Sequence, residues 1–346
     1  MGNYTREEIL QMVEEEDVEF IRLQFTDMFG AIKNIAVTAR ELPRALDNRC
    51  MINGEQIAGM DMEKGSDLYL SPILDTFAIL PWRPQQGKVA RMICDLYFPD
   101  GTPYKNSPRY ILENVAGKAQ EEGYTCYIDP ECEFFLFHTD DNGNPTTVTH
   151  EQAGYLDISP LDLGENVFEC ADRPGELSED AYYFIGGLLA HSKEMALITN
   201  PLVNSYKRLV PGYDAPTELT WTENNQNSLV RIPVTRGEGI CVELRSPDAS
   251  ANPYVVLAVC LAAGLDGIKN KITPTKSSNL AAQDQQAEHL PETLKEAIDY
   301  FESSSWVKEV LGEEFCRQYV AAKKNEWLRY TRQVTDWEIA EYLYRL

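Results

Sequence analysis

The most informative stretch of the chain is Asn200-Pro-Leu-Val-Asn-Ser-Tyr-Lys-Arg-Leu-Val-Pro-Gly-Tyr-Asp-Ala-Pro216. Its prolines at 211 and 216 and its glycine at 212 interrupt any continuous helix or central strand, so an ordered loop is predicted. The loop carries Lys207, Arg208 and Asp214, a cationic pair followed by a carboxylate. Because arginine is a planar fork of donors for phosphate or carboxylate oxygens, this pattern indicates an anion-binding loop. A turn whose charges face water is the alternative interpretation.

Length and charge limit what the protein can be. A chain of 346 residues can bury a sizeable core and form two domains. The net charge of -24 disfavours nucleic acid and anionic membranes as partners. No apolar run approaches the ~20 residues that span a bilayer, and the first residues lack the apolar core of a signal peptide. Eight cysteines without a C-x-x-C pair are typical of reduced thiols, so we expect a cytoplasmic protein.

Residues 1–103 are predicted to form a small, mostly antiparallel N-terminal domain. Thr5 and Glu8 have the spacing of a capping box at the start of an amphipathic helix. The remaining expected elements are strands at 20–25 and 32–37, a short helix at 42–46, a loop at 51–60, and strands at 67–72, 77–81 and 88–97.

Residues 104–346 are predicted to form a second domain, which opens with a helix that has Pro108 in its first turn. The expected elements are strands at 124–128 and 133–138, a hairpin turn at 140–145, a helix at 177–198, strands at 228–233 and 240–245, and an apolar helix at 253–268. The tail at 291–346 is charged and helical, with Trp306, Trp327 and Trp337 as its packing anchors.

Three carboxylates occupy positions typical of strands. Glu131 and Glu133 have the spacing that would place them on one face of a strand, and Glu243 lies on an alternating segment with Arg245 on the same face. Neighbouring carboxylates repel each other unless a cation lies between them, and Mg²⁺ or Mn²⁺ prefers such oxygen ligands. Taken alone, the pattern favours a solvated strand edge and a surface ion pair.

Together, these stretches resemble the glutamine synthetase family, from about residue 20 to the C-terminus. The likeness lies in the 200–216 stretch, in D-P-E-C-E-F-F-L-F at 129–137 and in V-E-L-R-S-P-D-A-S-A-N-P-Y at 242–254. It implies an α+β fold with a small β-grasp-like N-terminal domain and an antiparallel sheet domain with outer helices. It also implies Mg²⁺ or Mn²⁺, ATP and glutamate as ligands, and a homo-oligomer of stacked rings.

The resemblance assigns roles position by position. Metal ligands are Glu131, Glu133 and Glu243; substrate-binding residues are Arg208, Arg245 and Tyr155; catalytic residues are Asp214, Arg231 and Asn53. Arg208 matches the arginine that grips glutamate, Asp214 the flap acid, and Arg231 an arginine near the phosphoryl group. Asp67 and Tyr155 match positions near the ammonium site.

The sequence departs from the family in several places. A long segment that family members carry between residue 166 and the helix near Leu177 is missing, and with it three of the six expected metal ligands. Gln226 and Cys241 stand where phosphate-binding arginines are expected. Asn53 replaces the aspartate that accepts a proton from ammonium, and an amide cannot take that role. Nearby acids that could replace the lost ligands are Glu55, Glu169, Asp172 and Glu176.

These departures predict a degenerate glutamine synthetase-like protein. One missing acid or arginine costs about 10²–10⁵-fold in rate at comparable sites. Several lost together predict little or no ligase activity, weak or lost ATP and metal binding, and a binding or regulatory role. The alternative is an active glutamine synthetase, or an ATP-dependent carboxylate–amine ligase with a different substrate.

Overall fold

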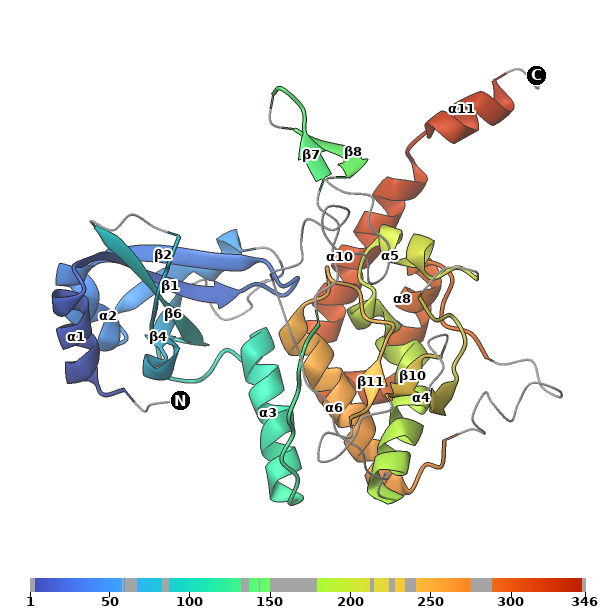
Figure 1. Cartoon of the computed structure of the whole chain (residues 1–346), viewed down its shortest axis with the longest axis horizontal. Coiled ribbons are helices and arrows are strands. Elements are labelled where there is room, and N and C mark those ends of the chain that lie inside the picture. Colours follow the sequence, from blue (N-terminus) through green and yellow to red (C-terminus); the bar gives the residue numbers. More distant parts are fainter. Residues whose placement is uncertain are drawn as a thin grey trace, which may run out of the picture.

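A mixed sheet and a helical body that begins with helix α3 organise the molecule (Figure 1). The computed structural model describes residues 4–57, 59, 67–82, 87–131, 137–142, 144–149, 179–211, 215–223, 228–233, 241–274 and 288–343. The predicted α+β class is confirmed, with a β-grasp N-terminal domain followed by short strands and helices.

The N-terminal body begins with a capped helix. Thr5 and Glu8 form the predicted capping box of α1. The elements that follow are α1 (Arg6–Glu15), β1 (Val18–Thr26), β2 (Ile32–Thr38), η1 (Ala39–Glu41), α2 (Leu42–Leu46), β3 (Cys50–Asn53), η2 (Gly54–Gln56), β4 (Asp67–Pro72), η3 (Leu74–Thr76), β5 (Ala78–Ile79) and β6 (Lys88–Tyr97).

The strands of this body form one sheet in the order β2-β1-β6-β4-β3, with β5 paired to β6. All described pairs are antiparallel except β1 with β6, which run parallel. Alternate residues of β1 and β6, including Ile21, Leu23 and Met92, are fully buried because one face of the sheet packs beneath α1 and α2.

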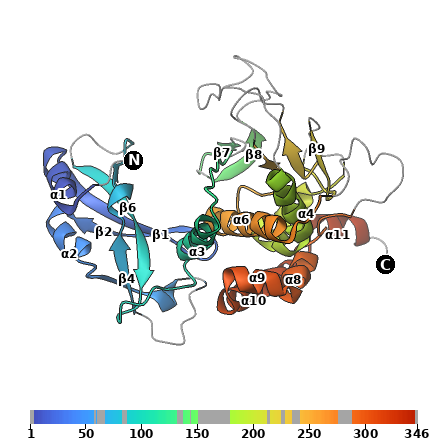
Figure 2. The same cartoon turned by 90° about the horizontal axis from the view of Figure 1, so that it is seen from below.

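The second body is mainly helical. Its elements are α3 (Pro108–Glu121), β7 (Phe137–Thr139), β8 (Pro145–Thr149), α4 (Glu179–Thr199), α5 (Val203–Arg208), β9 (Trp221–Glu223), β10 (Val230–Ile232), β11 (Glu243–Leu244), α6 (Pro253–Asn270), α8 (Leu294–Ser303), α9 (Ser305–Leu311), α10 (Glu313–Thr331) and α11 (Asp336–Tyr342). The strands pair as β11-β10-β9 and β7-β8. Figure 2 shows α6 lying between these strands and helices α8 to α10.

Helices α4 and α6 form the centre of this body and cross at glycines. A Cβ on Gly187 would lie 2.0 Å from the Ala263 carbonyl oxygen, and one on Gly267 would lie 2.1 Å from the Tyr183 carbonyl oxygen. The two backbones therefore approach as closely as glycine permits. Among the described helices, α6 alone is long and apolar enough to span a bilayer, but it packs against α3, α4 and α9 as a core helix.

The turn between β1 and β2 joins the two bodies. Asn252 caps α6 and donates from Nδ2 to the Asp27 and Met28 carbonyl oxygens, at 3.3 and 3.2 Å. Phe29 stacks on Tyr319 of α10, with ring centroids 5.7 Å apart. Lys323, only 5% exposed, lies over both rings and pairs with Glu326 at 2.9 Å. The N-terminal sheet is thus fixed to the helical body by backbone, aromatic and cationic contacts.

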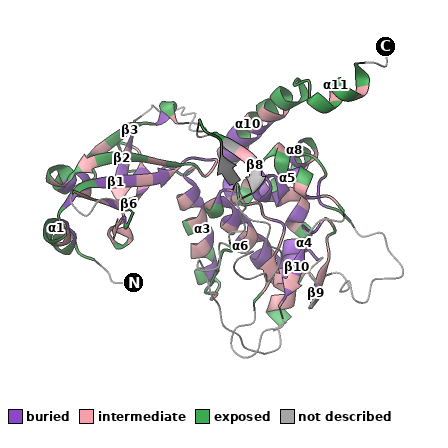
Figure 3. Ribbon diagram, turned by 45° about the horizontal axis from the view of Figure 1, so that its top comes forward, coloured by how far each residue is buried: buried purple, intermediate pink, exposed green. Residues whose placement is uncertain are grey.

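Several predicted elements need correction. The stretch 200–216 is not loop throughout, because α5 occupies Val203–Arg208 and ends before Pro211. Residues 51–53, predicted as part of a loop, belong to strand β3 (Cys50–Asn53), because that strand pairs with β4. Residues 124–128, predicted as a strand, have no regular structure. Trp337, predicted as a packing anchor, is 64% exposed on α11, which has no buried residue and projects from the body (Figure 3).

Candidate functional site

Arg208 is held at the end of α5 by backbone carbonyls. Its Nη2 donates to the Ser246 and Pro247 carbonyl oxygens and, at 3.4 Å, to Asn200 Oδ1. Its Nε is buried and has no hydrogen-bond partner within the described part of the chain. The guanidinium group is therefore fixed in direction but keeps a free donor.

Arg231, Glu243 and Arg245 form one cluster on the β10–β11 pair. The antiparallel register places Arg231 opposite Glu243, and Arg245 follows two residues later on the same face. Arg231 Nη1 donates to Glu243 Oε2 at 3.1 Å, and Arg245 Nε lies 3.2 Å from Glu243 Oε1. Each carboxylate oxygen thus faces a different guanidinium group. The predicted ion pair of Glu243 with Arg245 is confirmed, and Arg231 joins it from the neighbouring strand.

Asp248 lies beside Arg208 and was not singled out from the sequence. Burial opposes its ionisation, but hydrogen bonds from Ser250 and Ser205 and the charge of Arg208 outweigh burial and lower the pKa of Asp248. Its backbone N–H donates to the Thr199 carbonyl oxygen at 2.8 Å. The Ser-Pro-Asp-Ala-Ser sequence at 246–250 is typical of a turn, since an aspartate at this position accepts a hydrogen bond from the backbone N–H two residues later.

The predicted metal ligands are only partly described. Glu131 is exposed in a segment without regular structure, so it does not lie on the predicted strand. Glu133 lies outside the described residues, as do the nearby acids Glu169, Asp172 and Glu176. Among the residues that the structure describes, no three His, Cys, Asp or Glu side chains gather closely enough to hold a metal ion.

Some of the other predicted site residues lie within the described part of the chain and some do not. Asn53 and Asp67 are paired across β3 and β4, so the structure brings these two together. Asn53 is exposed, and its Oδ1 accepts from the Glu55 N–H at 3.0 Å. Tyr155, Asp214 and Gln226 lie outside the described residues, whereas Cys241 is described and exposed.

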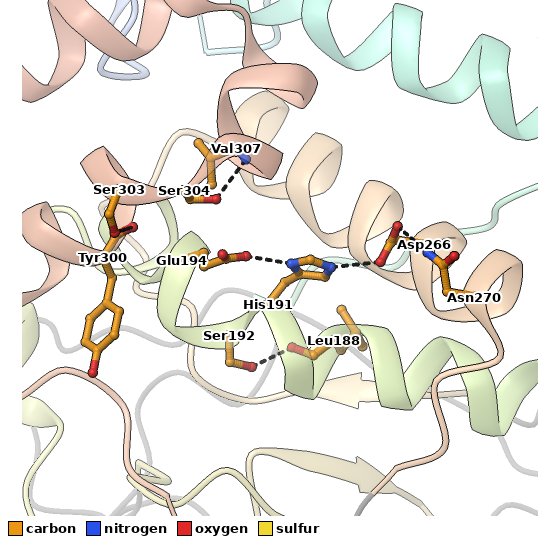
Figure 4. Close-up of polar contacts among 10 residues, drawn as sticks. All are labelled: Leu188, His191, Ser192, Glu194, Asp266, Asn270, Tyr300, Ser303, Ser304 and Val307. Carbon is orange, nitrogen blue, oxygen red and sulfur yellow. Dashed lines mark hydrogen bonds and ion pairs between the residues drawn. The ribbon is translucent and has the colours of Figure 1, made fainter.

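A second polar cluster, on α4, also escaped the sequence analysis (Figure 4). His191 Nδ1 lies 2.6 Å from Glu194 Oε2, and its Nε2 lies 3.0 Å from Asp266 Oδ2 on α6. The ring stacks on Trp306 of α9, with centroids 3.9 Å apart. Burial alone would lower the pKa of His191. The hydrogen bonds to the two carboxylates and the charges of those carboxylates have the larger effect, so the pKa of His191 is raised. The imidazolium form, which donates from both nitrogens, therefore links three helices.

Two family models match the chain in comparisons by sequence. The glutamine synthetase beta-Grasp domain family matches residues 17–99, and the glutamine synthetase catalytic domain family matches residues 105–168 and 152–342. The chain therefore belongs to the glutamine synthetase family, as the resemblance implied.

Individual relatives extend this match over nearly the whole chain. A glutamine synthetase from Clostridium saccharobutylicum is 41% identical over 440 residues, with 99% of each chain covered. One from Methanosarcina mazei is 39% identical over 436 residues, with 98% of each covered. A solved structure titled "Apo GmaS without ligand" has a TM-score of 0.73 at 25% identity and covers 97% of this chain and 99% of that chain.

These matches also place the predicted internal deletion. The alignment to the clostridial relative spans 440 positions, whereas this chain has 346 residues, so a substantial part of the relative has no counterpart here. The two matches to the catalytic domain family meet and overlap at 152–168. The missing part therefore falls near the end of the first match, where the sequence departs from the family pattern.

Proposed function

We propose that this chain is a reduced glutamine synthetase that forms little or no glutamine and binds a small carboxylate or phosphate through Arg208, Arg231 and Arg245. The observation that carries the proposal is the position of Glu243 between two guanidinium groups. A carboxylate whose two oxygens each face an arginine is already paired with cations of the protein, and the two guanidinium charges oppose the approach of a metal ion.

Charge at the cluster supports this proposal. Two arginines and one glutamate carry a formal charge of +1, whereas the charge of Arg208 in the adjoining segment is offset by the carboxylate of Asp248. Such a site attracts oxyanions and repels Mg²⁺ or Mn²⁺. The family reaction joins several anions and requires divalent cations as well as arginines to neutralise them. We therefore propose that ATP and metal binding are weak or lost.

The deletion supports loss of the reaction independently of Glu243. Three of the metal ligands that the resemblance implies fall within the segment that this chain lacks. Asn53 adds a second block, since an amide cannot accept the proton of ammonium. Because phosphoryl transfer precedes the attack of ammonia, a defect in the first step stops the reaction whatever the state of the second.

The remaining assignments stay proposals of the same kind. Asp214 and Tyr155 would close over and line the substrate site. Any residual metal binding would be weak and shared by Glu131 and Glu243, and Glu133 would be an ordinary carboxylate. We also propose a boundary between the two domains at residues 103 and 104, which lie after β6 and before α3. A homo-oligomer of ring type in the cytoplasm is proposed from the family alone, and the chain is expected to be soluble.

An active ligase is the second candidate. The observation that favours it is the match to curated glutamine synthetases over 98 to 99% of this chain. In that case a carboxylate from elsewhere would replace the missing ligands, and the substrate could be a different amine or carboxylate.

An activity assay separates the two candidates. The purified chain is incubated with Mg-ATP and glutamate, with and without ammonium or small amines, and released phosphate and glutamine are measured. We expect no glutamate-dependent phosphate release above the rate without enzyme. Release that depends on glutamate would overturn the proposal and establish the ligase.

A further inference from the structure

His191 stands between two carboxylates and satisfies both only while its ring is charged. Its Nδ1 faces Glu194 of the same helix and its Nε2 faces Asp266 of α6, on opposite sides of the ring (Figure 4). An imidazolium donates from both nitrogens, whereas a neutral imidazole donates from one and presents a lone pair at the other. Loss of one proton therefore leaves a carboxylate facing an acceptor, whichever tautomer forms.

The charge of this ring is set by groups on two helices. Burial opposes the charged form, but the two carboxylates, the charged groups that act on the ring within the described part of the chain, outweigh burial and raise the pKa of His191. The lysines near the cluster in sequence have other partners: Lys193 pairs with Glu288, and Lys308 of α9 donates to the Glu302 carbonyl oxygen. The imidazole is therefore the group of the cluster whose charge changes near neutral pH.

The two helices that carry the ring and the acids are held together independently of that charge. Gly187 lies one turn before His191 and packs against the backbone of α6, and Gly267 directly follows Asp266. Because the two backbones are in contact at these glycines, the crossing does not need the ring to be charged. Helices α4 and α6 are therefore the fixed part of the cluster.

Helix α9 is the short element of the cluster. It has seven residues, of which Val307 and Leu311 are buried. Trp306 is only partly buried and lies on the His191 ring, with the centroids 3.9 Å apart and the planes inclined by 17°. A cation over the face of an indole is attracted by its ring electrons, and a neutral imidazole loses that attraction. The attachment of α9 at Trp306 therefore depends on the proton of His191.

We propose that His191 is a proton-operated clasp: the imidazolium holds α4, α6 and α9 together, and loss of one proton loosens α9 at Trp306. The change is local, since the crossing of α4 with α6 stays closed. The pKa of His191 is raised above its ordinary value of about 6.5, so the clasp is closed at pH 6 and opens as the pH rises through the folded-state value. The clasp does not involve the arginine cluster and does not rest on the proposed function.

Hydrogen–deuterium exchange of the whole chain, followed by mass spectrometry from pH 6 to pH 9, tests the clasp. Each exchange rate is divided into the intrinsic rate at the same pH, which gives the protection of each peptide. For the peptide that contains α9, we expect protection to fall about fivefold to thirtyfold as the pH rises. A peptide from α1, in the N-terminal domain, should show no such fall.

Two variants and a control assign the response to His191. His191→Phe keeps a ring against Trp306 but has no proton to lose, so α9 should be weakly protected at every pH. Glu194→Gln removes one of the two acids that raise the pKa of His191, so the fall in protection should move to lower pH. His289→Asn removes an exposed histidine outside the cluster and should behave as the unmodified chain does. Should His191→Phe fold poorly by circular dichroism, the shift in Glu194→Gln decides.

A constant protection of α9 from pH 6 to pH 9 in the unmodified chain would overturn the proposal. A fall of equal size in α1 would do the same, because it would indicate a change of the whole fold. An unchanged pH response in His191→Phe, or a fall at the same pH in Glu194→Gln, would show that another group titrates. None of these results depends on glutamine formation, so the proposed loss of ligase activity is judged separately by the phosphate-release assay.

Discussion

The link made by His191 between α4, α6 and α9 predicts how stability depends on pH. The change is His191→Phe, which retains a ring against Trp306 but removes both N–H donors. In the protein these donors face Glu194 and Asp266, at 2.6 and 3.0 Å. A hydrogen bond to a charged group contributes about 1.5–3 kcal/mol. Asp266 retains the bond from Asn270 at 2.8 Å, so we expect a total loss of about 2–3 kcal/mol at pH 6.

The direction of the pH effect follows from the raised pKa of His191. A group whose pKa is higher in the folded state stabilises the fold fully below its unfolded value, about 6.5 for histidine. That contribution is lost as the pH rises through the higher, folded value. The difference in unfolding free energy between the unmodified chain and His191→Phe should therefore narrow from pH 6 to pH 9.

Urea unfolding at the two pH values, followed by circular dichroism, measures this difference. His289→Asn is the control, because it removes an exposed histidine that lies outside the His191 cluster. A difference for His191→Phe that is constant or widens with pH would refute the reasoning, since it would show that the ring is not held as an imidazolium.

Three further substitutions test other parts of the structure. Gly187→Ala places a Cβ 2.0 Å from the Ala263 carbonyl oxygen and should cost about 3 kcal/mol or more, seen as a lower midpoint of unfolding; an unchanged midpoint contradicts the helix crossing. Asn252→Ala removes the α6 cap and the bonds to the β1–β2 turn, and about 1–2 kcal/mol should be lost in urea, whereas no loss would contradict the junction. Asn53→Asp should not restore glutamine formation in a coupled assay, and activity gained by this change alone would show that the deletion spares phosphoryl transfer.

Local patterns were sufficient for much of the N-terminal fold. The alternation in β1 and the Thr5–Glu8 capping box are each visible within ten residues, and the structure confirms both. The parallel pairing of β1 with β6 could not be predicted this way, because it joins segments about 70 residues apart. Strand β3 was missed for a similar reason, since only its pairing with β4 defines it.

Prolines in the sequence predict where an element ends, but not whether the residues before them form a helix, a strand or a loop. Pro211 and Gly212 correctly excluded a long helix in the 200–216 stretch, yet the six residues of α5 are too few to show a helical period. Because tryptophan is usually buried, the sequence predicts Trp337 as a packing anchor, but no other described element covers α11.

The site was predictable where its residues share a strand. Alternation placed Glu243 and Arg245 on one face, but the addition of Arg231 depends on the register of a second strand. The His191 cluster could not be found from the sequence, because Asp266 lies 75 positions away on another helix. The family resemblance supplied the roles of Arg231, Glu243 and Arg245. Spacing alone predicted only a surface ion pair between Glu243 and Arg245.

We propose that Glu243 pairs with Arg231 and Arg245 and that the metal centre of the family is lost. Titration of the whole chain with Mn²⁺, in the presence of nucleotide and followed by calorimetry or electron paramagnetic resonance, tests it most directly. We expect no tight Mn²⁺ site and the same weak response in Glu243→Gln. Two tight sites per chain, abolished by Glu243→Gln, would contradict the account.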